Sequence, residues 1–187
     1  GIDPGLAGRE AELPEGNVTA VGGFFEDVDL AAGADIVICK DTLEHVADPL
    51  AFMKKIVDKG HADTMFFFQF PILDTLVALG HFDHIFHQHV NIFSLRSLEY
   101  LLQAVGCELM DHTINYQLWG SVLIAFRKKR QPERPLPPRQ WAPCSGEAVR
   151  AGYALFQENM AVTRRYLQAA AGRDRKSTRL NSSHVSQ

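Results

Sequence analysis

The chain has 187 residues, a length that predicts one domain with an appendage, since domains average about 150 residues. Its composition, with 46% hydrophobic, 22% charged and 10% aromatic residues, excludes a disordered or low-complexity protein. A formal net charge of -3 argues against a nucleic-acid partner, because phosphate contacts need an excess of Lys and Arg, and so favours a small-molecule partner.

Cysteine usage and hydropathy bear on the compartment. The three cysteines Cys39, Cys107 and Cys144 are widely spaced and include no Cys-x-x-Cys pair, so neither a disulfide framework nor a zinc knuckle is predicted. No apolar run approaches the roughly 20 residues of a membrane span, and no signal segment opens the chain. We therefore expect a cytoplasmic protein without membrane contact, and the sequence leaves its oligomeric state open.

The first part of the chain alternates strands and helical segments. The stretch from Val18 to Val21 predicts a short strand, and a short helical turn follows as far as Ala32. Between Asp35 and Lys40 the residues are all apolar, which is typical of a strand buried on both faces of a parallel sheet.

A helix and a second buried strand come next. Asp48 is the predicted N-cap and Pro49 the first residue of a helix that ends at Lys59-Gly60. The strand from Thr64 to Phe70 completes a strand-helix-strand pattern, which predicts a parallel βαβ unit.

Regular structure is not predicted between Pro71 and Ser94, a stretch long enough to be a functional insertion. Ser94 caps a helix that ends at Gly106. Two strands over residues 108–114 and 121–127 then predict an antiparallel pair at the sheet edge. A proline-rich linker over residues 128–145 precedes a final helix over residues 147–171.

Polar side chains follow the strand that ends at Lys40. Asp41, Glu44 and His45 come directly after it. In an open α/β sheet ligands bind beyond the carboxyl ends of the strands, so these residues and Lys40 are expected to face a pocket. For His45 itself we expect a structural role, as a ring hydrogen-bonded behind the loop.

The segment after this strand, Leu43-Glu-His-Val followed by Asp48-Pro49, resembles the fourth-strand region of class I S-adenosylmethionine-dependent methyltransferases. This resemblance implies an α/β fold with a Rossmann-like sheet, S-adenosyl-L-methionine as the cofactor and methyl transfer as the activity. It also implies a cofactor site in which Asp3 binds the ribose hydroxyls, because a strand-end carboxylate can accept two hydrogen bonds from a vicinal diol. The other residues that it implies at the cofactor are Phe24, Phe25 and Glu26 near the adenine and Lys40, Asp41 and Leu43 at the methyl site.

Four of the eight histidines fall between His81 and His89. This segment, from Phe82-Asp83 to Phe93-Ser94, resembles one found in the sugar C-methyltransferases. The resemblance implies that His89 is the general base, with His87 as the other candidate, and that the acceptor is a nucleotide sugar or a similar small molecule. Imidazole, with a pKa of about 6.5, suits the removal of a proton next to a carbonyl near neutral pH.

The acceptor is expected to contact Phe86, Gln88, Asn91 and Trp119. Phe86 and Gln88 stand where the sugar C-methyltransferases have Tyr and Glu, so a phenol and a carboxylate are absent. These departures leave open an O- or N-methyltransferase of the same fold, or a non-catalytic methyltransferase-like domain. The histidine spacing matches no zinc helix motif, so no metal is expected, and a metal-dependent hydrolase remains the outside alternative.

The resemblance also divides the chain. Residues 1–127 would be a partial methyltransferase domain, truncated at the N-terminal side of its sheet, whose first strand and glycine-rich loop are missing. Residues 128–145 would be the linker, and residues 146–172 a helix leading toward a missing second domain. The segment from Asp174 to His184 resembles a translated sequencing adapter, so we expect residues 173–187 to be an artefact.

Overall fold

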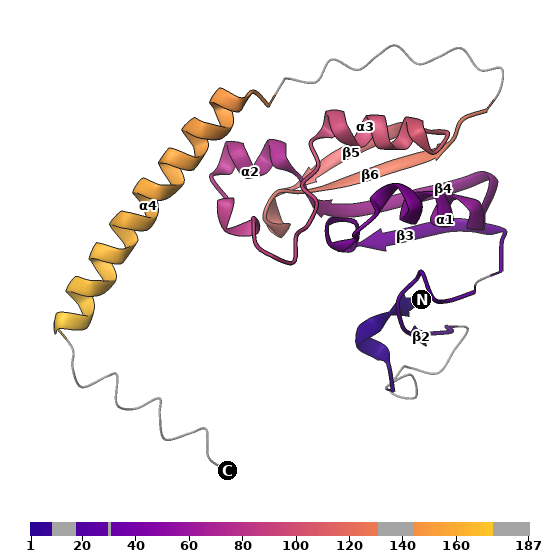
Figure 1. Ribbon diagram of the computed structural model, residues 1–187, viewed down its shortest axis with the longest axis horizontal. Coiled ribbons are helices and arrows are strands. Elements are labelled where there is room, and N and C mark those ends of the chain that lie inside the picture. Colours follow the sequence, from indigo (N-terminus) through magenta and orange to yellow (C-terminus); the bar gives the residue numbers. More distant parts are fainter. Residues whose placement is uncertain (9–17, 30, 131–143, 174–187) are drawn as a thin grey trace.

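The computed structural model describes residues 1–8, 18–29, 31–130 and 144–173 (Figure 1). Within these residues the strands form two sheets. Short strands β1 (Ile2–Asp3) and β2 (Val21–Gly22) make a parallel pair. The main sheet has the order β3-β4-β6-β5, with bounds β3 (Ala34–Lys40), β4 (Gly60–Pro71), β5 (Cys107–Asn115) and β6 (Ser121–Lys128).

The predicted βαβ unit is confirmed. Strand β3 runs parallel to β4, and helix α1 (Pro49–Lys59) connects them. The carboxylate of Asp48 accepts a hydrogen bond from the Ala51 backbone N–H at 3.0 Å, and Pro49 occupies the first turn, where its missing N–H costs nothing. Strands β5 and β6 form the predicted antiparallel pair, with β6 placed between β4 and β5 and β5 at the sheet edge.

Helices α1 and α3 (Leu95–Ala104) cover one face of the main sheet (Figure 1). Alternate residues of β4 point to that face, and Phe66, Phe68 and Phe70 are each 0% exposed. Phe66 stacks on Phe126 of β6 with ring centroids 5.0 Å apart. Burying each of these rings contributes about 2–3 kcal/mol, which makes this face the core of the molecule.

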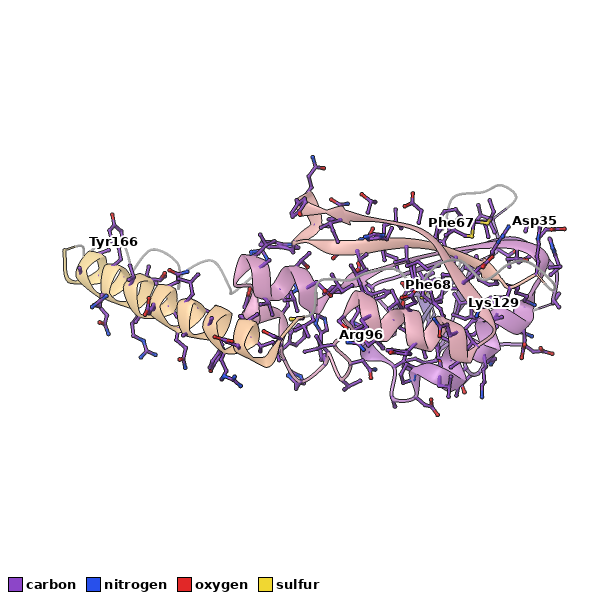
Figure 2. The ribbon with its side chains drawn as sticks, turned by 90° about the horizontal axis from the view of Figure 1, so that it is seen from above. Asp35, Phe67, Phe68, Arg96, Lys129 and Tyr166 are labelled. Atoms are coloured by element: carbon purple, nitrogen blue, oxygen red, sulfur yellow. The ribbon has the colours of Figure 1, made fainter. Side chains whose placement is uncertain are left out.

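The opposite face of the sheet is open. Ile36 and Ile38 are 61% and 75% exposed, so the predicted burial of β3 on both faces is wrong. In Figure 2, Phe68 points toward the helices and Phe67 points away from them. The reason is that, among the described residues, no helix packs on this second face.

The segment between β4 and α3 is more regular than the sequence indicates. It contains helix α2 (Leu73–Leu79) and the short 3-10 helix η4 (Phe82–His84), so the prediction of a wholly irregular stretch is wrong. Helix α2 ends at Gly80, whose φ of 69° is the left-handed conformation that glycine adopts readily at a helix end.

The final helix, α4 (Gly146–Arg173), confirms the helix predicted over residues 147–171. Its first turns pack against the segment between β4 and α3, with the ring of Phe82 5.5 Å from Tyr153 and 6.0 Å from Phe156. A Cβ at Gly152 would lie 3.0 Å from the carbonyl oxygen of Val77, so the helices approach closely only because this residue is glycine. Beyond this contact α4 extends away from the sheet (Figure 1).

The remaining expectations concern other parts of the chain. The helical turn predicted as far as Ala32 is only a turn around residues 25–27. Most of the proline-rich linker and nearly all of the adapter-like tail lie outside the described residues. No helix in the described part of the chain is long and apolar enough to cross a membrane.

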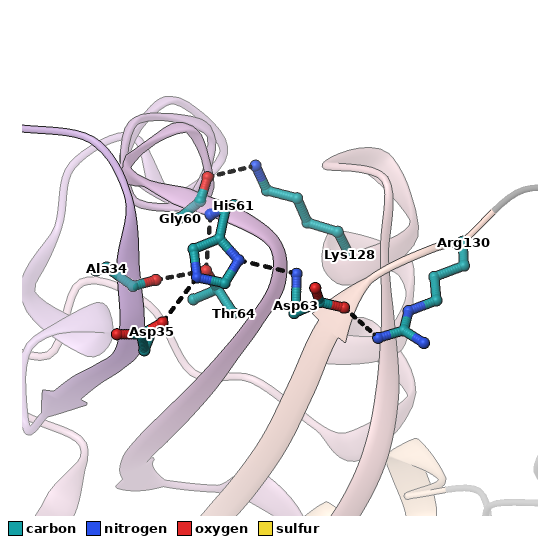
Figure 3. A network of polar contacts seen from close by, with 8 residues as sticks. All are labelled: Ala34, Asp35, Gly60, His61, Asp63, Thr64, Lys128 and Arg130. Atoms are coloured by element: carbon teal, nitrogen blue, oxygen red, sulfur yellow. Dashed lines mark hydrogen bonds and ion pairs between the residues drawn. The ribbon is translucent and has the colours of Figure 1, made fainter.

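A polar network joins the amino-terminal ends of β3 and β4 (Figure 3). The Nε2 atom of His61 contacts the Asp35 carboxylate at 3.0 Å, while its Nδ1 accepts a hydrogen bond from the Asp63 backbone N–H at 3.1 Å. The Thr64 hydroxyl donates to the carbonyl of Ala34 at 2.5 Å. The network fixes this end of the sheet, and the carboxyl ends of the same strands lie at the opposite end. Its other members in Figure 3 are Gly60, Lys128 and Arg130.

Candidate functional site

The chain turns sharply where β3 ends. Asp41 has a φ of 47°, a left-handed conformation that few residues other than glycine adopt, and its backbone N–H donates to the carbonyl of Gln69 at 2.8 Å. The Lys40 ammonium lies 3.1 Å from the Asp41 carboxylate. This strained turn directs the chain into the 3-10 helix η3 (Leu43–His45), at the end of the sheet where ligands bind in open α/β folds.

A second loop, residues 85–93, lies over η3. The Asn91 backbone N–H donates to the carbonyl of Glu44 at 3.0 Å, and its side-chain amide donates to the carbonyl of Val46. At the far end of the loop, the Leu73 N–H donates to the carbonyl of Phe93 at 2.8 Å. The two bonds of Asn91 bring together residues that lie about 45 positions apart in the sequence.

His89 lies at the centre of this contact. Its Nδ1 is 2.7 Å from the carbonyl oxygen of His84, and a carbonyl can only accept, so Nδ1 carries the proton. The Nε2 atom of the neutral ring is then an unprotonated base. The ring of Phe86 lies 4.1 Å from that of His89, and burial lowers the pKa of His89. The imidazole is therefore held neutral and in one tautomer.

His45 faces His89. Its Nδ1 lies 2.9 Å from the carbonyl oxygen of Gln88, so this ring also carries its proton on Nδ1. The two imidazole rings are 4.9 Å apart at an angle of 63°. The hydrogen bond predicted for His45 is present, but the ring lies within the site rather than behind it.

Glu44 is a buried carboxylic acid beside these rings. Its side chain is 3% exposed, and Oε1 lies 3.9 Å from Nε2 of His45. Among the described residues, Oε2 has no hydrogen-bond partner. Burial raises the pKa of Glu44, because the charged form is poorly solvated there. The site thus contains two imidazoles and a carboxyl group at the end of β3.

Comparison with known proteins decides the family. A family model described as a methyltransferase domain matches residues 1–112, which include β1 to β4, η3 and the loop that carries His89. The chain belongs to this methyltransferase family.

Individual relatives agree with this membership. The C-methyltransferase NovU of Streptomyces niveus is 32% identical over 133 residues, which are 66% of this chain and 31% of that protein. Among solved structures, LepI in complex with SAM gives a TM-score of 0.55 at 18% identity and covers 68% of this chain and 35% of that one. A Haloferax volcanii methyltransferase complex with the activator Trm112 gives 0.54 at 12% identity, with 67% and 68% covered. The likeness to the structures shows a Rossmann-like methyltransferase fold.

The residues predicted for the nucleoside half of the cofactor lie around the β1-β2 pair of this methyltransferase domain. Asp3 ends β1 and is exposed, and its carboxylate accepts a hydrogen bond from the Gly5 N–H at 2.7 Å. Phe24 follows β2 and is 63% exposed. Phe25 instead packs edge-on against Phe52 of α1 at 5.6 Å, and the Glu26 carbonyl accepts a hydrogen bond from the Lys55 ammonium.

The residues predicted at the methyl site of the methyltransferase divide into two groups. Lys40 and Asp41 have half-exposed side chains at the end of β3. Leu43 is 1% exposed and packs in the core, where it anchors η3 from below. Contact between Leu43 and a cofactor therefore remains a prediction. Because the side chain is buried, only the backbone of Leu43 could make that contact.

The residues predicted at the acceptor gather around His89. Phe86 contacts its ring, and Trp119, which is 64% exposed, lies 6.1 Å from the ring of His84. Gln88 contributes its carbonyl to His45, and the amide of Asn91 joins the two loops. His87 is exposed, and its ring lies 6.1 Å from that of Phe86. Acceptor contacts of these side chains remain predictions.

Two features of the site escape the sequence-based assignment. Glu44 and His45 are expected at the pocket, but the sequence does not indicate that they lie beside His89, because His45 and His89 are 44 positions apart. The carbonyl of His84 that fixes the His89 tautomer is a backbone group, and its position depends on the η4 turn. The clue that the sequence offers is the pair Glu44-His45 shortly after an apolar strand.

Proposed function

We propose that this chain is part of an S-adenosyl-L-methionine-dependent C-methyltransferase in which His89 is the general base. The observation that carries the proposal is the 2.7 Å hydrogen bond from His89 Nδ1 to the carbonyl of His84, which leaves Nε2 as the basic atom. The exposed aromatic rings of Phe86 and Trp119 beside it suit a flat or cyclic small molecule. The resemblance to a protein named a C-methyltransferase supports transfer to carbon.

The described residues fit the nucleoside half of the cofactor. Asp3 and Gly22 are partners in the register of the parallel β1-β2 pair, so an exposed carboxylate and the exposed ring of Phe24 follow neighbouring strand ends. A carboxylate can hold two ribose hydroxyls, and an aromatic ring offers a face to adenine. When bound, S-adenosyl-L-methionine supplies an electrophilic methyl group.

The residues of the chain would prepare the acceptor carbon for methylation. Nε2 of His89 removes the proton from a carbon next to a carbonyl, and its Nδ1–H remains bonded to the His84 carbonyl as the ring becomes positively charged. That bond stabilises the imidazolium and keeps the ring in place. The acceptor that this chemistry requires is a carbonyl compound with an acidic neighbouring C–H, and a nucleotide ketosugar is our candidate.

A first test uses the protein that carries this chain. We expect His89→Ala to lower methyl transfer to nucleotide ketosugars by about 100-fold or more, since general bases contribute about 10²–10⁴-fold. A second measurement reports on the base alone. In D₂O, the acidic C–H of the acceptor should exchange for deuterium, and proton NMR monitors this exchange. Exchange should be lost in His89→Ala even without the cofactor.

His61→Ala is the matched control, because this histidine lies in the network at the opposite end of β4 (Figure 3). It should exchange and turn over at the rate of the unmodified protein. His87→Ala tests the competing base directly. If His87→Ala abolishes deuterium exchange and His89→Ala does not, the assignment of the base to His89 is wrong.

A further inference from the structure

Three metal-ligating groups converge at the carboxyl end of β3. Glu44, His45 and His89 each offer one ligand atom, and these atoms lie within 4.8 Å of one another. Glu44 and His45 come from η3, and His89 comes from the loop over it. Two independent segments therefore meet with chemistry that suits a transition metal.

The orientation of both imidazoles matches that of metal ligands. Nδ1 of His45 donates to the carbonyl of Gln88 at 2.9 Å, and Nδ1 of His89 donates to the carbonyl of His84 at 2.7 Å. Histidines that bind metals commonly donate their other ring N–H to a backbone carbonyl in this way. Each ring is thereby fixed with the lone pair of Nε2 available.

The carboxylate supplies an observation that is independent of the histidines. Glu44 is 2% exposed, and its Oε2 atom has no hydrogen-bond partner among the described residues. A buried carboxylate oxygen without a donor is costly, and a bound cation is one way to satisfy it. With both imidazoles neutral, His45 and His89 offer the carboxyl group of Glu44 no positive charge. A metal ion would bind all three side chains at once.

We propose that Glu44, His45 and His89 form a binding site for a zinc ion. Two imidazole nitrogens and one carboxylate oxygen are a ligand set that zinc uses in sites with three protein ligands, and the fourth position is left to water or another small ligand. Oε1 of Glu44 and Nε2 of His45 are 3.9 Å apart. Bonds of about 2.0–2.2 Å to zinc bring ligand atoms somewhat closer than this, so small rotations of the side chains complete the site.

This site goes beyond the proposed function, and its effect on activity follows only if that function holds. Zinc on Nε2 of His89 occupies the lone pair that would remove the acceptor's proton. Zinc binding and base catalysis are then mutually exclusive, so zinc inhibits the enzyme. The binding itself depends only on the geometry of the three residues.

The test measures zinc binding to the 187-residue chain without a histidine tag, by competition with a chromophoric chelator. One equivalent of zinc should bind, and His45→Ala and Glu44→Gln should each weaken the binding by about 10-fold or more, because even residues that only support a metal ligand contribute this much. His81→Ala is the matched control and should bind zinc as the unmodified chain does. Far-UV circular dichroism checks that each variant is folded.

Cobalt gives a second measurement, because the visible absorption of bound Co²⁺ reports on the geometry of the site directly. Co²⁺ added to the unmodified chain should produce the intense visible absorption of a tetrahedral nitrogen and oxygen site, and His45→Gln should remove it.

Absence of stoichiometric zinc binding, or equal binding by His45→Ala, overturns the proposal. Zinc binding that is lost in His81→Ala but kept in His45→Ala places the metal on the other histidines and also overturns it. A bound zinc without any effect of His89→Ala on deuterium exchange refutes the proposed base and leaves the metal site standing.

Discussion

At the scale of single residues, the burial of Glu44 leads to a prediction about stability. Its carboxyl group is buried beside His45, and Oε2 has no partner in the described part of the chain. Replacing a buried ionisable group by a neutral isostere removes the cost of burying its charged form. We expect Glu44→Gln to raise the free energy of unfolding by about 1 kcal/mol, measured by urea denaturation with EDTA present.

Glu108 provides the matched comparison, because this carboxylate accepts a hydrogen bond from Nε of Arg127 at 2.8 Å. Glu108→Gln breaks that pair and should lower the free energy of unfolding. Opposite signs for the two substitutions would support the view that Glu44 is kept for its chemistry. If Glu44→Gln is as destabilising as Glu108→Gln, the carboxylate is structural.

Cys107 gives a pH-dependent prediction at the same scale. It is 0% exposed, and burial raises its pKa from 9.0 to about 11. The unfolded chain therefore loses this proton at lower pH than the folded chain, so stability is full below pH 9 and falls as the pH rises toward 11. In Cys107→Ala the loss of stability between these pH values should be smaller by about 1–2 kcal/mol, read from denaturant midpoints at each pH. Equal losses in both proteins would show that the thiol does not titrate there.

At the scale of elements, the sequence predicts best where local chemistry defines the boundaries. Asp48 and Pro49 mark the start of α1, and Ser94 marks the start of α3, and both helices begin at these positions. Helix α2 was missed because Ile72 precedes it without a side-chain cap and the helix has only seven residues. The spacing of its leucines and the glycine at position 80 were the available clues.

The cap of α3 can be tested directly. The Ser94 hydroxyl accepts a hydrogen bond from the Ser97 N–H at 3.1 Å, and Ser97 Oγ accepts one from the Ser94 N–H at 2.9 Å. Ser94→Ala removes the first of these bonds and should lower the free energy of unfolding by about 1 kcal/mol, as measured by thermal or urea unfolding. Ser94→Asp keeps an acceptor at the cap and should recover most of that loss. A Ser94→Asp variant as unstable as Ser94→Ala would mean that the side-chain acceptor is not what matters.

At the scale of the whole molecule, the sequence predicts the layers but not the exposure of the sheet. Alternation of strands and helices, together with the family resemblance, leads to the parallel β3-β4 unit and the antiparallel pair beside it. Burial on both faces of β3 was expected from its apolar run, yet that pattern cannot say which other elements are present to cover it. The geometry of the site cannot be predicted from the sequence for a similar reason. The contact of His45 with His89 depends on two loops that meet only in the folded chain.

The open face of the sheet leads to a prediction about association. Ile36 and Ile38 point from β3 into solvent, and Leu123 of β6 is 37% exposed. Exposed apolar surface on a sheet promotes contact between copies of a chain, so we expect the 187-residue chain to self-associate as its concentration rises. Ile36→Lys combined with Ile38→Lys should reduce this association, measured by sedimentation velocity over a range of concentrations. Helix α4 also carries exposed apolar side chains, so Val162→Lys combined with Leu167→Lys is the matched control. Association that persists in the β3 variant and disappears in the α4 variant would show that the helix, and not the sheet, mediates self-association.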